Sequence, residues 1–273
     1  MEARSAVRGC RLQAGPSQFS LPGLPSTPVP ASAPPTFLVG IDLAWGERNG
    51  DGLCLLAADA RHVRVAESAH VFGDAALLGW LEARLPPAPA PALLLLDAPV
   101  VCPNETGSRP ADRQTHTHFG RFHAGAHPAN RARCVRPLRI TELVCSRLGF
   151  APGWEHPRTA RLAVEVFPHP AAVRWLGLTR IVKYKRPPAA TRRAEFARFQ
   201  GLLRDGLPGR FPELEENAAL HKLLAAPWTK PAEDQLDALL CALVGYQHWQ
   251  HDGARSQVLG DLESGFIVVP AAD

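Results

Sequence analysis

The chain has 273 residues and a formal charge of +4, which suits one large domain and permits, without requiring, a polyanionic partner. No apolar run approaches the roughly 20 residues that cross a bilayer, and residues 1–35 hold no continuous hydrophobic segment. A membrane span and a secretory signal are therefore not expected. The six cysteines lack zinc-like spacing and are expected to be reduced, which favours a cytoplasmic location.

Residues 1–35 are expected to form a disordered tail, or to precede the true start of the protein. They are rich in Pro, Ser and Ala and carry several Arg, a composition with too few large apolar side chains for a core. An organelle transit peptide is the minor alternative. Residues 36–270 are predicted to form a single α/β domain.

Three predicted strands open this domain, each followed by turn residues. Residues 36–43 form a short apolar run, residues 46–52 have the Asn and Gly of a turn, and residues 53–58 are apolar again. Residues 62–67 alternate between apolar and polar, which is typical of a half-buried strand. We expect the three strands to pair as an antiparallel meander.

A helix and a central strand follow the meander. Apolar residues recur at helical spacing over residues 73–85, and a Pro-rich stretch ends this pattern. Residues 92–96 are apolar without alternation, so they predict a strand buried on both faces and joined in parallel through the helix.

The second half of the chain begins with a polar insert at residues 100–153, between the fourth and fifth predicted strands. It is rich in Arg, His, Thr, Asn and Pro, and a polar segment of this length within a compact domain is usually functional or disordered. The later predicted elements are a helix at 138–148 inside the insert, a strand at 161–167, helices at 171–176, 190–204, 214–225 and 229–250, and an edge strand or tail at 265–270.

Three carboxylates lie in or at the ends of predicted strands. Asp42 closes the first strand, Asp97 follows four leucines, and Glu165 lies between two valines of the fifth strand. Burying an unpaired carboxylate costs several kcal/mol, so each one needs a hydrogen bond, a cation or a metal ion. For Asp97 a strand-end turn is an equal alternative. For Glu165 the alternative is an ion pair with Arg161 or with an arginine of the insert.

Two further acids lie on the predicted C-terminal helix. Asp234 and Asp237 are three residues apart and so share one face of it. Asp234 falls in the first turn, where the helix dipole favours a negative charge without any functional role. Asp237 lies among apolar residues and is expected to be half buried. Together with Asp42 and Asp97 they predict an acidic site, and carboxylate ligands select Mg²⁺ or Mn²⁺ over zinc.

Six short motifs accompany these acids: Gly40-Ile-Asp42-Leu-Ala-Trp45, Asp97-Ala-Pro99, Pro103-Asn104 with Gly107-Ser-Arg109, Glu165-Val-Phe-Pro168, Lys183-Tyr-Lys185 and Glu233-Asp234-Gln-Leu-Asp237. Over residues 36–250 the order of elements and motifs resembles the ribonuclease H-like fold. It is more closely similar to a family of bacterial and archaeal proteins predicted to be nucleases of this fold. The resemblance implies a mixed five-stranded sheet, three antiparallel strands followed by parallel ones, flanked by helices.

The resemblance also implies roles for single residues. Asp42, Asp97 and Asp237 would be the metal ligands, and Asp234 would be a fourth acid. Glu165 would bind metal or orient Arg109. The residues that would contact substrate are Arg109, Lys183, Lys185, Trp45 and Asn104. Arg113 is better explained as part of a solvated basic face. Trp45 would stack on a base, and the alternative for it is packing in the core.

Histidines offer a proton acceptor for hydrolysis. His169 lies between two prolines beside Glu165 and would be held rigidly near the acids, so it is the preferred general base. The insert contains four more histidines at uneven spacing, for which solvated positions are the simpler interpretation: His116, His118, His123 and His127.

The leading interpretation is a Mg²⁺- or Mn²⁺-dependent nuclease that hydrolyses phosphodiesters of nucleic acid, with two ions stabilising the attacking and leaving oxygens. One alternative is a nucleotide-binding phosphotransferase of the actin and sugar-kinase type. Residues 49–52 would then imitate a phosphate-cradling hairpin, although that group encloses its nucleotide between two such domains. The other alternative is a non-catalytic nucleic-acid-binding module on the same fold.

Overall fold

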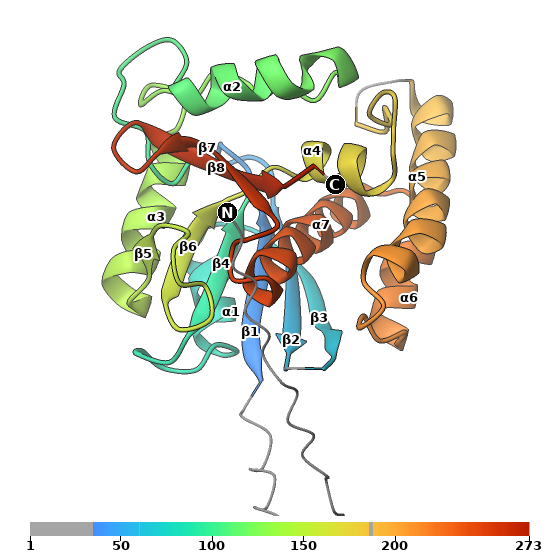
Figure 1. Cartoon of the computed structure of the whole chain (residues 1–273), viewed down its shortest axis with the longest axis horizontal. Coiled ribbons are helices and arrows are strands. Elements are labelled where there is room, and N and C mark those ends of the chain that lie inside the picture. Colours follow the sequence, from blue (N-terminus) through green and yellow to red (C-terminus); the bar gives the residue numbers. More distant parts are fainter. Residues whose placement is uncertain (1–34, 60, 186–187, 273) are drawn as a thin grey trace, which may run out of the picture. The chain divides into compact units, whose positions relative to one another are not determined.

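The computed structural model of the protein describes residues 35–59, 61–185 and 188–272 (Figure 1). The tail predicted over residues 1–35 lies outside this part of the chain except for its last residue. The described residues belong to one compact unit. Among them, no helix combines the length and the apolar character needed to cross a bilayer.

A mixed sheet of six strands forms the centre of the domain, in the order β3-β2-β1-β4-β6-β5. The three N-terminal strands pair antiparallel, and β4, β6 and β5 continue the sheet in parallel. The expected mixed α/β sheet, antiparallel and then parallel, is confirmed. Its strands are β1 (Thr36–Asp42), β2 (Asp51–Ala58), β3 (Val63–Val71), β4 (Ala92–Leu96), β5 (Ala151–Pro152) and β6 (Arg161–Glu165).

The expected number of five strands was wrong by one. The additional strand is β5, which has two residues and pairs with β6 at the edge of the sheet. Two residues cannot show any periodicity, so no sequence pattern marks this strand. The strand expected at residues 265–270 exists, but it does not belong to the main sheet. It pairs with an unpredicted strand in a separate hairpin made of β7 (Ser256–Asp261) and β8 (Gly265–Pro270).

Helices cover both faces of the main sheet, so β2 and the centre of β1 are buried on both sides. Among the helices, α7 makes the most extensive contacts with the sheet, and it packs across β1, β2 and β4. The helices are α1 (Asp74–Glu82), α2 (Pro110–Phe119), α3 (Val135–Leu148), α4 (Pro168–Trp175), α5 (Ala189–Arg210), α6 (Ala218–Ala225) and α7 (Lys230–Gln250), with a 3-10 turn, η1 (Gly120–Phe122), after α2.

Register assigns α7 and α3 to opposite faces of the sheet. Asp42 pairs with Gly52, so Asp51 points to the other side of β2. On that side the Asp51 carboxylate forms an ion pair with Arg136 of α3, at 2.6 Å. Asp42 shares its face with Gly40, whose Cα approaches the backbone of α7. The carboxylate that ends β1 therefore lies on the face covered by α7.

The insert is more regular than its polar sequence predicts. It contains α2 in addition to the expected helix at 138–148, which is α3. In Figure 1, α2 and the β7–β8 hairpin lie side by side over one end of the main sheet. A small apolar cluster joins them; its buried members include Ala111, Phe119, Leu259 and Ile267. These elements form a roof beside the carboxyl ends of the parallel strands.

The first prediction concerns the close approach of α7 to the sheet. In Gly40→Ala the new Cβ would lie 1.9 Å from the carbonyl oxygen of Ala238 and 2.5 Å from the amide nitrogen of Ala242. Backbone atoms cannot swing aside, so we expect a loss of about 1–3 kcal/mol, or more, in the free energy of unfolding by urea denaturation. Gly46→Ala, where no atom lies within 4 Å of the new Cβ, is the control. Equal stability of the two variants would contradict the packing.

Candidate functional site

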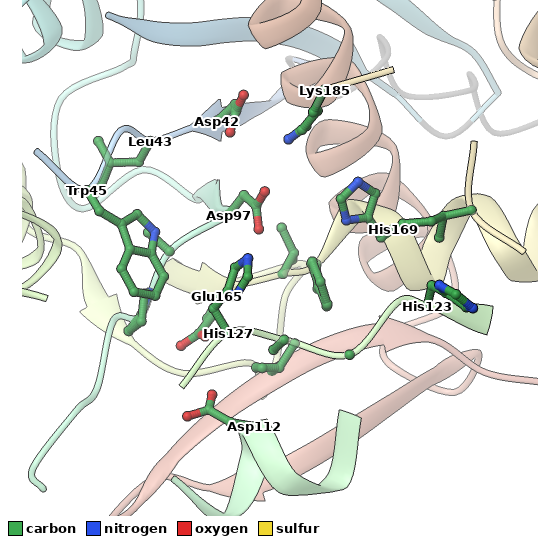
Figure 2. Close-up of a pocket in the computed structure, with 18 of the residues that line it drawn as sticks. Asp42, Leu43, Trp45, Asp97, Asp112, His123, His127, Glu165, His169 and Lys185 are labelled. Carbon is green, nitrogen blue, oxygen red and sulfur yellow. The ribbon is translucent and has the colours of Figure 1, made fainter. Parts of the chain in front are cut away.

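Two carboxylates lie next to each other at the ends of adjacent parallel strands. Ile41 of β1 pairs with Leu96 of β4, and the amide of Asp97 donates a hydrogen bond to the Ile41 carbonyl at 2.9 Å. Asp42 and Asp97 are thus at the same level and on the same face. Both line a cavity of about 890 Å³. Figure 2 shows their carboxylates pointing toward the amino group of Lys185.

Glu165 also lines the cavity, but its carboxylate has a partner in the protein. It pairs in register with Leu96, one position before Asp97, so alternation along the strand turns it away from the face of Asp42 and Asp97. Its two oxygens accept hydrogen bonds from both terminal nitrogens of Arg109, at 2.6 and 2.7 Å. Glu165 was expected either to bind metal or to orient Arg109, and the structure shows its contact with Arg109.

Arg109 was expected to hold a substrate phosphate, yet its donors are already used. The side chain is 1% exposed. Its guanidinium donates to Glu165, to Asp112 of α2 and to the carbonyl of Val101, and these bonds occupy all five N–H groups. Burial lowers the pKa of Arg109, but the charges of Glu165 and Asp112 outweigh this and keep it fully protonated. Arg109 fixes the shape of the site and has no N–H left for substrate.

A third acid, Asp237 of α7, is held by two consecutive residues of the loop before α5. The hydroxyl of Tyr184 donates to Oδ1 at 2.5 Å, and the ammonium of Lys185 lies 2.6 Å from Oδ2. Burial lowers the pKa of Lys185, but the charges of Asp237 and Asp42 raise it well above its usual range. Lys185, expected to contact phosphate, is therefore a charged cation among the acids.

The protein itself opposes ionisation of the two strand-end acids. Burial raises the pKa of Asp97 to about 7, an effect that Lys185 reduces and Asp237 increases. Burial likewise raises the pKa of Asp42 well above its usual range, against the charge of Lys185. A further positive charge in the cavity would favour the ionised form of both.

His169 lies beside this group at the start of α4 and lines the same cavity. Burial, with the charge of Lys185, lowers its pKa to about 4, so the ring is neutral at pH 7 and able to accept a proton. Its ring makes edge contacts with Phe167 and Tyr184, at 5.5 and 6.5 Å between centroids. This placement agrees with the expectation that His169 lies near the acids.

Asp234 is not among the residues that line the cavity. Its carboxylate contacts Lys230 at 2.6 Å and the ring of His70 at 3.1 Å. These contacts join the first turn of α7 to β3. Although it shares a helix face with Asp237, Asp234 serves here in the packing of α7 on the sheet.

The other expected substrate residues divide into two groups. Trp45 and Lys183 line the cavity, as do two of the insert histidines, His123 and His127. Asn104 does not: its side-chain amide donates to the carbonyls of Thr106 and Ala129 and so fixes the insert.

Sequence reasoning missed two residues that shape the site. Asp112 accepts from the Arg109 amide at 2.9 Å and from the Ala129 amide at 2.9 Å. A Pro at the start of a helix followed two residues later by an acid is a helix-start signal, and it would have indicated α2 and Asp112 together. Tyr184 gave no such signal, because its role depends on the path of a loop.

The donor set fits a divalent cation of the magnesium type. Such an ion is commonly bound through one or two carboxylates and keeps several waters. Asp42 and Asp97 provide two neighbouring carboxylates at the edge of a cavity open to water. The described residues include no cluster of three or more His, Cys, Asp or Glu side chains suited to a metal ion. The remaining ligands would therefore be water or substrate.

A comparison with protein families finds one match, to the family described as "Protein of unknown function (DUF429)", over residues 40–263. The matched segment contains every candidate site residue named above. A search of curated proteins finds no match.

We expect Arg109→Met to lower the free energy of unfolding by about 3–5 kcal/mol, because it leaves the buried carboxylates of Glu165 and Asp112 without a cation. Urea denaturation measures the change. Arg113→Met is the matched control: this arginine is exposed and donates to the Ser108 carbonyl, so its loss should change stability by no more than about 0.5 kcal/mol. Equal effects of the two substitutions would refute the structural role of Arg109.

Proposed function

The chain belongs to the DUF429 family, and we propose that it is a metal-dependent phosphodiester hydrolase of the nuclease type. The observation that carries the proposal is the pair Asp42 and Asp97. Their carboxylates end adjacent parallel strands and face one cavity, and burial raises the pKa of both. Two buried carboxylates side by side are costly to ionise, so a ligand of opposite charge is their natural partner.

The ribonuclease H-like fold is part of this proposal. Strand order supports it: three antiparallel strands, then β4 and β6 in parallel beside β1. The acids at the ends of β1 and β4 and the acid on a helix packed across them support it further. Likeness of fold alone does not establish chemistry, so the case for hydrolysis depends on the site.

Asp42 and Asp97 would hold Mg²⁺ or Mn²⁺. A bound ion of this kind activates water and stabilises negative charge on phosphoryl oxygens. Neutral His169 would accept a proton from the attacking water, and Lys185 would attract the phosphate. In the overall reaction one water is consumed: its oxygen forms a new bond to phosphorus, the P–O ester bond breaks, and the leaving oxygen takes a proton from solvent.

The walls of the cavity suit one unpaired nucleotide of a nucleic acid. Its volume of about 890 Å³ is typical of small-ligand sites, which span roughly 300–1,000 Å³. Trp45 and Phe167 offer aromatic surface for a base, and Lys183 offers a positive charge for the backbone. Ile267 of the hairpin lines one side of the cavity, and we infer that an unpaired nucleotide enters it more readily than a double helix does.

The phosphotransferase alternative has less support. It requires residues 49–52 to cradle phosphates with their backbone. Gly50 instead packs on His70, and Gly52 packs on the backbone carbonyl of Asp234, where added Cβ atoms would lie within 2.3 Å. These glycines are explained by the packing of β2 against β3 and α7.

Metal binding is the primary test. We expect millimolar Mn²⁺ to raise the melting temperature of the native chain, since an ion that binds the folded state alone must stabilise it, by about 2.7 kcal/mol at 100 times the Kd. Asp97→Asn should lose this response and also lose cleavage of single-stranded DNA and RNA oligonucleotides. Asp205→Asn, an exposed acid of α5, should keep both. A native chain that neither responds to metal nor cleaves any oligonucleotide would refute the proposal and leave the non-catalytic module.

The rates of hydrolysis of single-stranded and double-stranded oligonucleotides test the shape of the pocket. An oligonucleotide should be hydrolysed at least about tenfold faster alone than annealed to its complement, because only an unpaired nucleotide fits a cavity of small-ligand size. Gel electrophoresis of an end-labelled strand measures both rates. Faster cleavage of the duplex would show that the roof does not restrict entry.

A further inference from the structure

Lys185 is held in place by a buried aromatic cluster. The ring of the preceding residue, Tyr184, stacks on Phe199 of α5 at 5.0 Å between centroids and lies 6.0 Å from Phe196. The Tyr184 hydroxyl is bonded to Asp237. The backbone that carries Lys185 is therefore anchored next to the acids, and its side chain is 30% exposed. A lysine on a mobile surface segment, by contrast, has a long side chain that samples many rotamers.

The charges grouped around Lys185 favour a single divalent ion. The carboxylates of Asp42, Asp97 and Asp237 all interact with the ammonium of Lys185, so this local group has a net charge of minus two when all four are ionised. One divalent cation neutralises this group, whereas two would leave it at plus two. Glu165 does not change the balance, because its charge is matched by Arg109.

The contacts of Asp237 lead to the same conclusion. A second ion would need a further carboxylate, and Asp237 of α7 is the acid that would supply it. Its Oδ1 already accepts from Tyr184, and its Oδ2 already contacts Lys185. A metal ion at this carboxylate would have to displace a cation that is itself bound there.

We propose, on the basis of the function proposed above, that the site binds one divalent ion, on Asp42 and Asp97, and that the ammonium of Lys185 supplies the second positive charge. The sequence led us to expect two ions. In the one-ion site, the N–H groups of Lys185 bind a non-bridging or leaving oxygen of the phosphate. Charge stabilisation of this kind requires no transfer of the lysine proton.

The test counts bound Mn²⁺ per chain by isothermal titration calorimetry, with electron paramagnetic resonance to detect ion pairs, and needs no substrate. We expect one ion for the native chain. Lys185→Gln removes the charge and frees Oδ2 of Asp237, so we expect two ions and a spin-coupled Mn²⁺ pair. Lys185→Arg should keep one ion because it keeps the charge. Lys183→Gln, which alters the cavity two residues away, is the matched control and should also bind one.

Each outcome has a distinct meaning. Two ions in the native chain, or a single ion in a folded Lys185→Gln variant, overturns the one-ion site and leaves metal-dependent hydrolysis standing. No ion in the native chain refutes the proposed function itself. If Lys185→Gln folds only with Mn²⁺ present, the count is made on protein refolded in Mn²⁺ and freed of excess ion. The native and Lys185→Arg counts decide the question independently.

Discussion

The buried guanidinium of Arg109 is the interaction on which the geometry of the site depends most. Its hydrogen bonds join the end of β6, the loop after β4, and the first turn of α2. Gly265 of β8 lies so close that a Cβ there would contact its side chain at 2.8 Å. Removing a cation and two carboxylates from water is costly and is offset only when every donor is satisfied. Three regions distant in sequence, namely residues 101–112, the end of β6 and the start of β8, are therefore fixed relative to one another.

A second buried arginine, Arg136, fixes the backbone that follows Asp42, from the other face of the sheet. Arg136 of α3 forms an ion pair with Asp51 and donates to the carbonyl of Ala44, at 2.6 Å. The amide of Ala44 donates in turn to Asp51, at 2.9 Å. The backbone two residues beyond Asp42 is thus bound at both polar atoms. The ion pairs of Glu165 and Asp51 with arginines thus hold the backbone around Asp42 and Asp97 in position.

The predictable parts of the fold are those with a long, repeated pattern. The apolar run at 92–96 is a strand buried on both faces, and α7 begins where Thr229, as a capping residue, and Pro231 indicate. The strand-end positions of Asp42 and Asp97 follow from the same runs. No such pattern exists for β5, with its two residues, and the His- and Thr-rich composition of α2 concealed its helical character.

Within the site, the sequence could not resolve differences of one residue or the path of a loop. Whether Glu165 faces the other acids depends on its register with Leu96, since a shift by one position reverses the face. The motif around Lys185 suggested a contact with substrate phosphate but not the contact with Asp237, because the segment between α4 and α5 has no regular structure around residues 181–185. Asp234 and Asp237 share a helix face, yet the neighbours Lys230 and His70 give Asp234 a different role.

The hairpin that roofs the cavity has a consequence for how the protein is made. The acids of β1, β4 and α7 have all left the ribosome before residues 256–270, and the cavity lacks the wall formed by Ile267 until those residues follow. Because chains emerge from the N-terminal side at a finite rate, the sheet can assemble while its acidic edge is still open. During synthesis that edge stays open on the side that Ile267 later covers, and the order of translation thus separates formation of the strand-end site from completion of its wall.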